Sequence, residues 1–134
     1  MIQSEVADRV LAMPGTPAYG TLSVWARLWT DARQVLALGP GEFVPRPKVN
    51  SAFVVFDPIP ESVEIEDQEL LREIVRCVFQ HRRKTLRGAL RRRVPGAEQG
   101  LEAAGLDPSR RGETLSEREF VQLANAIARE DAQP

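Results

Sequence analysis

The pattern of hydrophobic and polar positions changes character near residue 60 of this chain. Before that point, residues 4–12 and 21–30 carry apolar side chains at helical spacing, whereas residues 33–38 and 48–56 have the apolar content and alternation of strands. We therefore predict two helices followed by two strands. The connection between the strands is short, which favours an antiparallel pair.

Two of these elements carry more specific expectations. In the helix over residues 21–30, we expect the face with Leu22, Trp25 and Trp29 to point inward, with Leu28 as a further candidate for burial. In the strand over residues 48–56, both alternating sets of side chains are largely apolar. A strand of this kind is typically buried on both faces.

A proline-containing segment, Asp57-Pro58-Ile59-Pro60-Glu61, separates the first pattern from the second. The two prolines remove two backbone donors and favour an extended path. Beyond them the apolar spacing is helical, and it predicts helices over residues 67–79, 83–93, 97–104 and 115–130. At the start of the last helix, Ser116 and Glu119 have the spacing of a capping box.

These elements predict an α+β fragment in two parts. Residues 1–57 supply the antiparallel strand pair and two helices, residues 58–66 form a linker, and residues 67–134 form a small all-α domain. So few strands do not make a stable sheet by themselves. We therefore interpret the first part as the end of a larger α/β domain.

Composition excludes several classes of protein. Of the 134 residues, 43% are hydrophobic, which is enough for a packed core. No segment approaches the roughly 20 apolar residues of a membrane helix, and the first residues do not resemble a secretory signal. A single cysteine, Cys77, excludes an internal disulfide, and with a single histidine it cannot form a Cys/His zinc site. We expect a cytoplasmic monomer that binds no metal and, unless a charged segment contacts an acidic bilayer, no membrane.

A net charge of −1 conceals a strongly basic segment. Residues 72–93 carry nine basic side chains and one acidic side chain, a net charge of +8. The flanking residues 1–66 and 94–134 are acidic, at −3 and −4. Such a concentration of positive charge favours a polyanionic partner, with nucleic acid first and an acidic membrane second.

The predicted helix over residues 83–93 places its cations on one side. Leu86, Ala89 and Leu90 share an apolar face, and an adjacent stripe contains Arg83, Lys84, Arg87 and Arg91. Their like charges repel at this spacing, and a phosphate backbone would relieve that repulsion. The alternative is a solvated face whose arginines form ion pairs with Glu98, Glu102 or Glu113. For Arg82 and Arg93, which lie near the apolar face, snorkelling or internal pairing is at least as favoured as contact with RNA.

A second candidate is the loop Phe43-Val44-Pro45-Arg46-Pro47-Lys48-Val49-Asn50-Ser51. The prolines stiffen the loop, and an exposed aromatic ring there could stack on a base. The alternative is a Phe43 side chain that folds back into the core, and the residues alone favour that alternative.

Several of these segments together resemble one family. The specific ones are the Phe43 loop and Arg82-Arg83-Lys84-Thr85-Leu86-Arg87. They are accompanied, in order along the chain, by Gln3-Ser4-Glu5-Val6-Ala7-Asp8-Arg9-Val10, Ala18-Tyr19-Gly20-Thr21-Leu22-Ser23-Val24 and Gly105-Leu106-Asp107-Pro108-Ser109-Arg110-Arg111. The chain resembles the C-terminal half of the KsgA family of ribosomal RNA adenine N6,N6-dimethyltransferases.

The resemblance implies an activity and a fold. Members of this family transfer methyl groups from S-adenosylmethionine to two adjacent adenines in the 3′-terminal hairpin of small-subunit rRNA. Their catalytic domain is a Rossmann-like methyltransferase sheet, and a helical C-terminal domain helps to hold the RNA. Residues 1–57 would then be the end of that sheet. The implied partner is small-subunit rRNA within the ribosomal subunit.

The resemblance also implies roles for individual residues. Phe43 would stack on the flipped-out target adenine, which reverses the interpretation from the loop alone. Arg82, Arg83, Lys84 and Arg87 would contact rRNA, and Arg91 extends the same stripe. Tyr19, Pro45 and Lys48 are weaker candidates for the substrate pocket, and a buried structural hydroxyl is the favoured alternative for Tyr19.

The family's cofactor motifs do not occur in this sequence. Neither a glycine-rich turn after a strand nor an N-L-P-Y motif is present. We therefore expect this chain to bind no S-adenosylmethionine and to be inactive alone, as a truncated enzyme. His81 stands where the family usually has Gln, and its basic neighbours should keep it neutral at pH 7.

Three functional hypotheses stay open at this point. The chain is the RNA-recognition end of a dimethyltransferase, a stand-alone RNA- or ribosome-binding module without catalysis, or a DNA-binding descendant of the family. Upstream coding sequence would separate the first two. A preference for structured RNA over duplex DNA would argue against the third.

Overall fold

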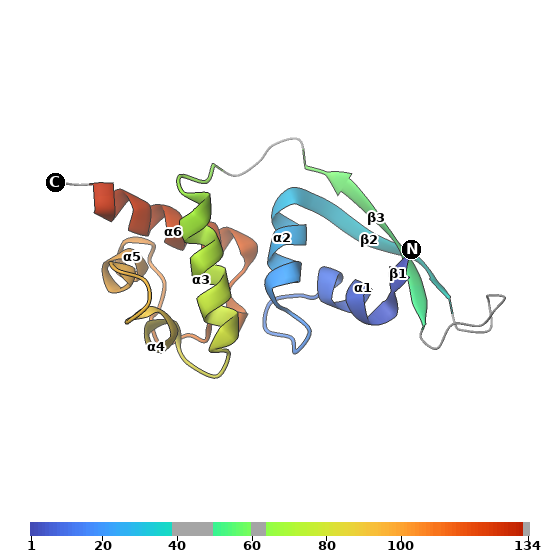
Figure 1. Cartoon of the computed structure of the whole chain (residues 1–134), viewed down its shortest axis with the longest axis horizontal. Helices are drawn as coiled ribbons and strands as arrows, with labels where there is room; N and C mark the ends of the chain where they lie inside the picture. Colours follow the sequence, from blue (N-terminus) through green and yellow to red (C-terminus); the bar gives the residue numbers. More distant parts are fainter. Residues whose placement is uncertain (39–49, 60–63, 133–134) are drawn as a thin grey trace. The chain divides into compact units, whose positions relative to one another are not determined.

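A computed structural model of the chain describes residues 1–38, 50–59 and 64–132. It consists of two compact units, Met1–Ser62 and Val63–Pro134 (Figure 1). The first unit contains helices and strands, and the described elements of the second are helical. This arrangement confirms the predicted α+β organisation.

The first unit is built on a three-stranded antiparallel sheet. Strands β1 (Ile2–Gln3), β2 (Thr30–Leu38) and β3 (Ser51–Pro58) are arranged in the order β1-β3-β2. The predicted antiparallel pair is thus β2 and β3, with Ala32 opposite Phe56 and a register irregularity between Gln34 and Leu36. The N-terminal strand β1 was not predicted, because two residues are too short to show alternation.

Helices α1 (Ser4–Leu11) and α2 (Thr21–Trp29) lie on one side of this sheet (Figure 1). The core between them contains Ala7, Val10, Val24, Leu28 and Ala52, none more than 6% exposed. Ser23 Oγ, buried in α2, donates a hydrogen bond to the carbonyl oxygen of Arg9 and ties the two helices together.

The predicted burial of two elements in this unit was wrong. Leu22 and Trp29 are 44% and 42% exposed, because α2 turns Ser23 and Val24 inward, whereas Leu28 is buried as expected. Phe53 and Phe56 of β3 are 40% and 45% exposed, so this strand is not buried on both faces. Residues 53 and 56 point to opposite faces of the strand, so both faces of β3 are partly exposed, although α1 and α2 lie on one side of the sheet.

The second unit has its own hydrophobic core. It begins with α3 (Gln68–Gln80), whose first turn is capped by Asp67 accepting from the backbone N–H of Leu70 at 3.1 Å. It ends with α6 (Glu117–Ala132). The fully buried side chains of these two helices form the centre of the core: Leu71, Ile74, Val75, Val78, Phe120, Leu123 and Ile127.

Short elements complete this unit between α3 and α6. They are α4 (Leu86–Leu90), α5 (Ala97–Ala103) and the single 3-10 turn η2 (Gly112–Thr114). Gly100 lets α5 approach α6 closely, because a Cβ atom there would overlap the Ile127 side chain. The capping box at the start of α6 is confirmed, since the Ser116 N–H donates to Glu119 Oε1 at 3.0 Å and the Glu119 N–H to Ser116 Oγ at 3.2 Å.

The predicted basic helix over residues 83–93 was wrong. Only Leu86–Leu90 is helical, and the residues on either side form turns. Thr85 caps α4 by accepting from the Gly88 N–H at 3.1 Å. The N–H groups of Leu86 and Arg87 donate to the carbonyls of Arg110 and Pro108, at 2.7 and 3.1 Å. These contacts start the helix at Leu86, so Arg83 and Lys84 precede it rather than extend a helical stripe.

A candidate RNA-binding surface

The turn between α3 and α4 presents two exposed cations of the basic segment. Arg83 and Lys84 are exposed, and the Lys84 N–H closes the turn by donating to the His81 carbonyl at 2.9 Å. Among the residues that the structure describes, neither side chain has an acidic partner. Their charge is therefore available to an external anion.

Arg82, in the same turn, is anchored to the protein. Its Nε donates to Glu113 Oε2 at 2.9 Å, and its guanidinium carbon lies 5.7 Å from the centroid of the Phe79 ring. The side chain is 35% exposed. The internal pairing predicted from its place near the apolar face is confirmed.

Two further cations extend the surface along α4, and both face the same carboxylate. Glu98 Oε1 lies 3.0 Å from Arg87 Nε and 3.8 Å from Arg91 Nε. Arg87 and Arg91 remain more than half exposed at 55% and 64%. The predicted alternative of pairing with nearby acids therefore holds for Arg82, Arg87 and Arg91, but not for Arg83 and Lys84.

Arg111 joins this surface from a distant part of the sequence. It is exposed and forms an isolated antiparallel bridge with Thr85, so it lies directly beside the basic turn. Its neighbour Arg110 instead pairs with Glu119 at 2.6 Å, which raises the pKa of Arg110 and lowers that of Glu119. Sequence reasoning did not select Arg111, because nothing in the local charge pattern distinguishes it from Arg110.

Two titratable side chains near the surface have shifted pKa values. Partial burial lowers the pKa of His81, and the neighbouring charges of Arg93 and Lys84 lower it further. This direction agrees with the predicted neutral imidazole at pH 7. Burial raises the pKa of the Cys77 thiol, with a further contribution from Glu73, so the thiol form is favoured.

The remaining candidates belong to the first unit. Tyr19 is fully buried, at 0% exposure. Phe43, Pro45 and Lys48 lie outside the described residues, so their predicted roles stay predictions. Within residues 1–38, 50–59 and 64–132, no cluster of histidine, cysteine, aspartate or glutamate has the geometry of a metal site. In those same ranges, no helix has both the length and the apolar content needed to cross a bilayer.

Comparisons with known proteins agree on one family. The model of the ribosomal RNA adenine dimethylase family matches residues 1–129. Proteins called ribosomal RNA small subunit methyltransferase A are 46% identical in Syntrophotalea carbinolica and 44% identical in Dinoroseobacter shibae, over 95% and 96% of this chain. The chain spans about half the length of these relatives, 50% and 46%.

Solved structures share the fold. A dimethyladenosine transferase from Plasmodium falciparum superimposes with a TM-score of 0.83 at 23% identity, over 96% of this chain and 56% of that one. The 23S rRNA methyltransferase ErmE gives a TM-score of 0.59 at 22% identity, over 94% of this chain and 52% of that one. With the family model matching nearly the whole sequence, the chain belongs to the ribosomal RNA adenine dimethylase family.

Proposed function

We propose that this chain supplies the RNA-binding and base-stacking part of an rRNA (adenine-N6,N6)-dimethyltransferase. The whole enzyme would use S-adenosylmethionine to dimethylate two adjacent adenines in the 3′-terminal hairpin of small-subunit rRNA. The chain itself would bind the RNA of the ribosomal subunit as a cytoplasmic monomer. It would bind no S-adenosylmethionine and would have no activity alone.

The observation that carries this proposal is the pair of exposed cations in the turn before α4. Arg83 and Lys84 have no acidic partner among the described residues, and Arg111 stands beside them through the bridge to Thr85. Each phosphate that such a cation neutralises releases counterions and favours binding. Arg82, Arg87 and Arg91 would border this centre, with their charge partly offset by Glu113 and Glu98.

In this proposal the catalytic contribution of the chain comes from Phe43, which would stack on the flipped-out adenine. Pro45 and Lys48 would shape the same loop. The complete burial of Tyr19 favours its structural alternative over direct contact with the substrate. The chemical step itself would need groups that the wider family supplies from other parts of its chains.

The test is binding of the chain to a fragment of small-subunit rRNA across a series of salt concentrations. The triple variant Arg83→Ala, Lys84→Ala, Arg87→Ala should bind more weakly, with a smaller salt slope. Arg83 and Lys84 should each account for about 0.9 of the loss in slope. Arg87 should account for less, because Glu98 already lies 3.0 Å from it.

A matched control removes the same charge elsewhere. Arg72→Ala, Arg76→Ala, Arg118→Ala changes three arginines of α3 and α6, and it should keep the wild-type slope. Equal losses of slope in the two triple variants would mean that only net charge matters and would contradict the proposal. Circular dichroism of each variant verifies that it is folded.

A binding module without catalysis is the second candidate. It is favoured by the second unit, which encloses its own core and carries the described basic surface. Incubation of the chain with small ribosomal subunits and labelled S-adenosylmethionine tests the lack of activity proposed for this chain. Methyl transfer to rRNA by the chain alone would contradict both candidates as stated here.

A further inference from the structure

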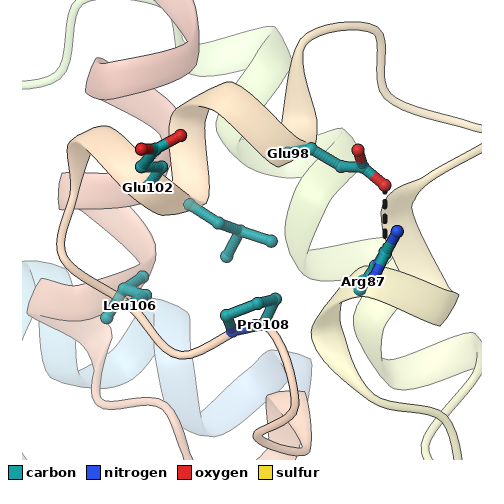
Figure 2. Close-up of a pocket in the computed structure, with 6 residues that line it drawn as sticks. Arg87, Glu98, Glu102, Leu106 and Pro108 are labelled. Carbon is teal, nitrogen blue, oxygen red and sulfur yellow. Dashed lines mark hydrogen bonds and ion pairs between the residues drawn. The ribbon is translucent and has the colours of Figure 1, made fainter.

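A pocket opens in the second unit immediately beside the basic surface. It encloses about 460 Å³, within the range of roughly 300–1,000 Å³ that is typical of ligand sites. It is lined by Arg87, Glu98, Leu101, Glu102, Leu106 and Pro108, which come from α4, α5 and the loop after α5. Figure 2 shows Arg87 and Glu98 at one side, Glu102 and Leu106 at the other, and Pro108 between them.

The lining combines apolar walls with hydrogen-bond acceptors. Pro108 is exposed, and Leu101 and Leu106, which are 1% and 7% exposed, form the base of the apolar wall. Glu98 is held at the rim because its Oε1 accepts from Arg87 Nε at 3.0 Å (Figure 2). Its Oε2, and both carboxylate oxygens of Glu102, accept no hydrogen bond from the residues that the structure describes. The carboxylates therefore remain available as acceptors for a donor on the ligand.

The charge around the pocket limits what can occupy it. Two carboxylates alone would suit a cationic side chain of a peptide. However, Arg87 lines the pocket and the exposed Arg91 lies 3.8 Å from Glu98, and both cations repel a basic peptide and attract phosphate. A nucleotide satisfies both conditions, since its base is neutral, its edge can donate to a carboxylate, and its phosphates can contact the cations.

We propose that this pocket binds one unpaired guanine of the RNA, with its Watson–Crick edge donating to the carboxylate of Glu98. Guanine is the base whose edge carries two adjacent donors, the N1–H and the N2 amino group. A bidentate pairing would use the available Oε2 of Glu98 and the second lone pair of Oε1, whose other lone pair accepts from Arg87. The ring lies on the walls formed by Leu101, Leu106 and Pro108. The inference rests on the proposed RNA binding and adds a base preference to it.

The experiment compares three short single-stranded RNAs of equal length at one salt concentration. All are oligouridylates, one carrying a central guanosine, one a central inosine that lacks the N2 amino group, and one only uridine. Fluorescence anisotropy with the full chain should give about tenfold tighter binding for guanosine than for uridine, with inosine between them. The variant Glu98→Gln should lose this preference and bind the all-uridine RNA at least as tightly as wild type, because a negative charge is removed.

The control Glu69→Gln makes the same charge change on α3, away from the pocket, and should keep the guanosine preference. A second readout uses guanosine monophosphate alone, which should shift the methyl NMR signals of Leu101 and Leu106, whereas uridine monophosphate should not. This readout stays informative if Glu98→Gln proves unfolded.

Three outcomes would overturn the inference. Salt-dependent binding of all three RNAs with equal affinity would overturn it and leave the proposed function intact. No binding of any RNA by the folded chain would overturn the proposed function as well. Methyl shifts of Leu101 and Leu106 on adding oligolysine, but none on adding guanosine monophosphate, would make the pocket a site for a basic peptide.

Discussion

The two units of this chain differ in how completely they bury their apolar side chains. In the described residues, every large hydrophobic side chain that is markedly exposed belongs to the first unit, including Trp29, Val35, Leu36, Phe53 and Phe56. The second unit encloses its large apolar side chains between α3 and α6. A helical unit can surround a small core, whereas three strands with helices on one side leave the other side of the sheet open. The second unit is therefore the more self-sufficient structure.

The largest expected difference in the free energy of unfolding is between two single variants, each of which truncates one phenylalanine, the first in the helical unit and the second in the sheet. Phe120 is fully buried in α6 and contacts Phe79 at a ring separation of 5.9 Å, so Phe120→Ala should destabilise the chain by about 3–5 kcal/mol. Phe53 is 40% exposed, and Phe53→Ala should cost less than about 1 kcal/mol. Urea unfolding measures both changes. Equal costs would mean that the sheet is packed as tightly as the helical core.

A pair of glycines tests how tightly the second unit is packed. In Gly100→Ala, the added methyl group would overlap Ile127, so we expect a loss of about 1–3 kcal/mol in the free energy of unfolding. In Gly88→Ala, the nearest atom would lie 3.4 Å away, in ordinary contact, and higher helix propensity should stabilise α4 by about 0.5–1 kcal/mol. Thermal unfolding of both variants checks the opposite signs.

A further prediction concerns the acid sensitivity of the second unit. Arg110 lowers the pKa of Glu119, so the ionised carboxylate stabilises the fold above its unfolded pKa, near 4.3. This stabilisation is lost as the pH falls through the lower folded pKa. In Glu119→Gln the capping-box acceptor remains but the charge is gone, and we expect a loss of about 1 kcal/mol at pH 7.

The measurement for this variant is the free energy of unfolding between about pH 6 and pH 3, in wild type and in Glu119→Gln. The wild type should lose more stability on acidification than the variant does. Glu73 and Asp107 also have lowered pKa values, so part of the acid dependence should persist in the variant. Parallel pH profiles would contradict a stabilising role for the Arg110–Glu119 pair.

Local sequence signals predicted those features that depend on neighbouring residues. The capping box of Ser116 and Glu119 formed as predicted, because both partners lie within one turn. The antiparallel pairing of β2 with β3 also followed from alternation and a short connection. Of the candidate site residues, Arg83, Lys84, Arg87 and Arg91 could be selected from the charge pattern and Arg82 only from the family resemblance, although their individual partners could not be predicted.

The features that failed prediction depend on residues far apart in the chain. The basic segment was predicted as one helix because its periodicity was locally consistent, yet the loop over residues 108–110 accepts hydrogen bonds from the N–H groups of Leu86 and Arg87. Arg111 reached the basic surface through its bridge to Thr85, which no local pattern encodes. Exposure of Phe53 and Phe56, which point to opposite faces of β3, likewise depends on how much of the sheet the packed helices cover.

The sequence by itself determined the α+β class, most of the element order, the concentration of positive charge and the resemblance to the rRNA dimethyltransferases, because these follow from residue type and short-range spacing. Tertiary structure alone decided which cations are neutralised. Glu113 forms an ion pair with Arg82, and Glu98 pairs with Arg87 and Arg91, while Arg83 and Lys84 remain exposed. The physical reason is that an ion pair requires two side chains within about 4 Å, and long-range folding sets that distance.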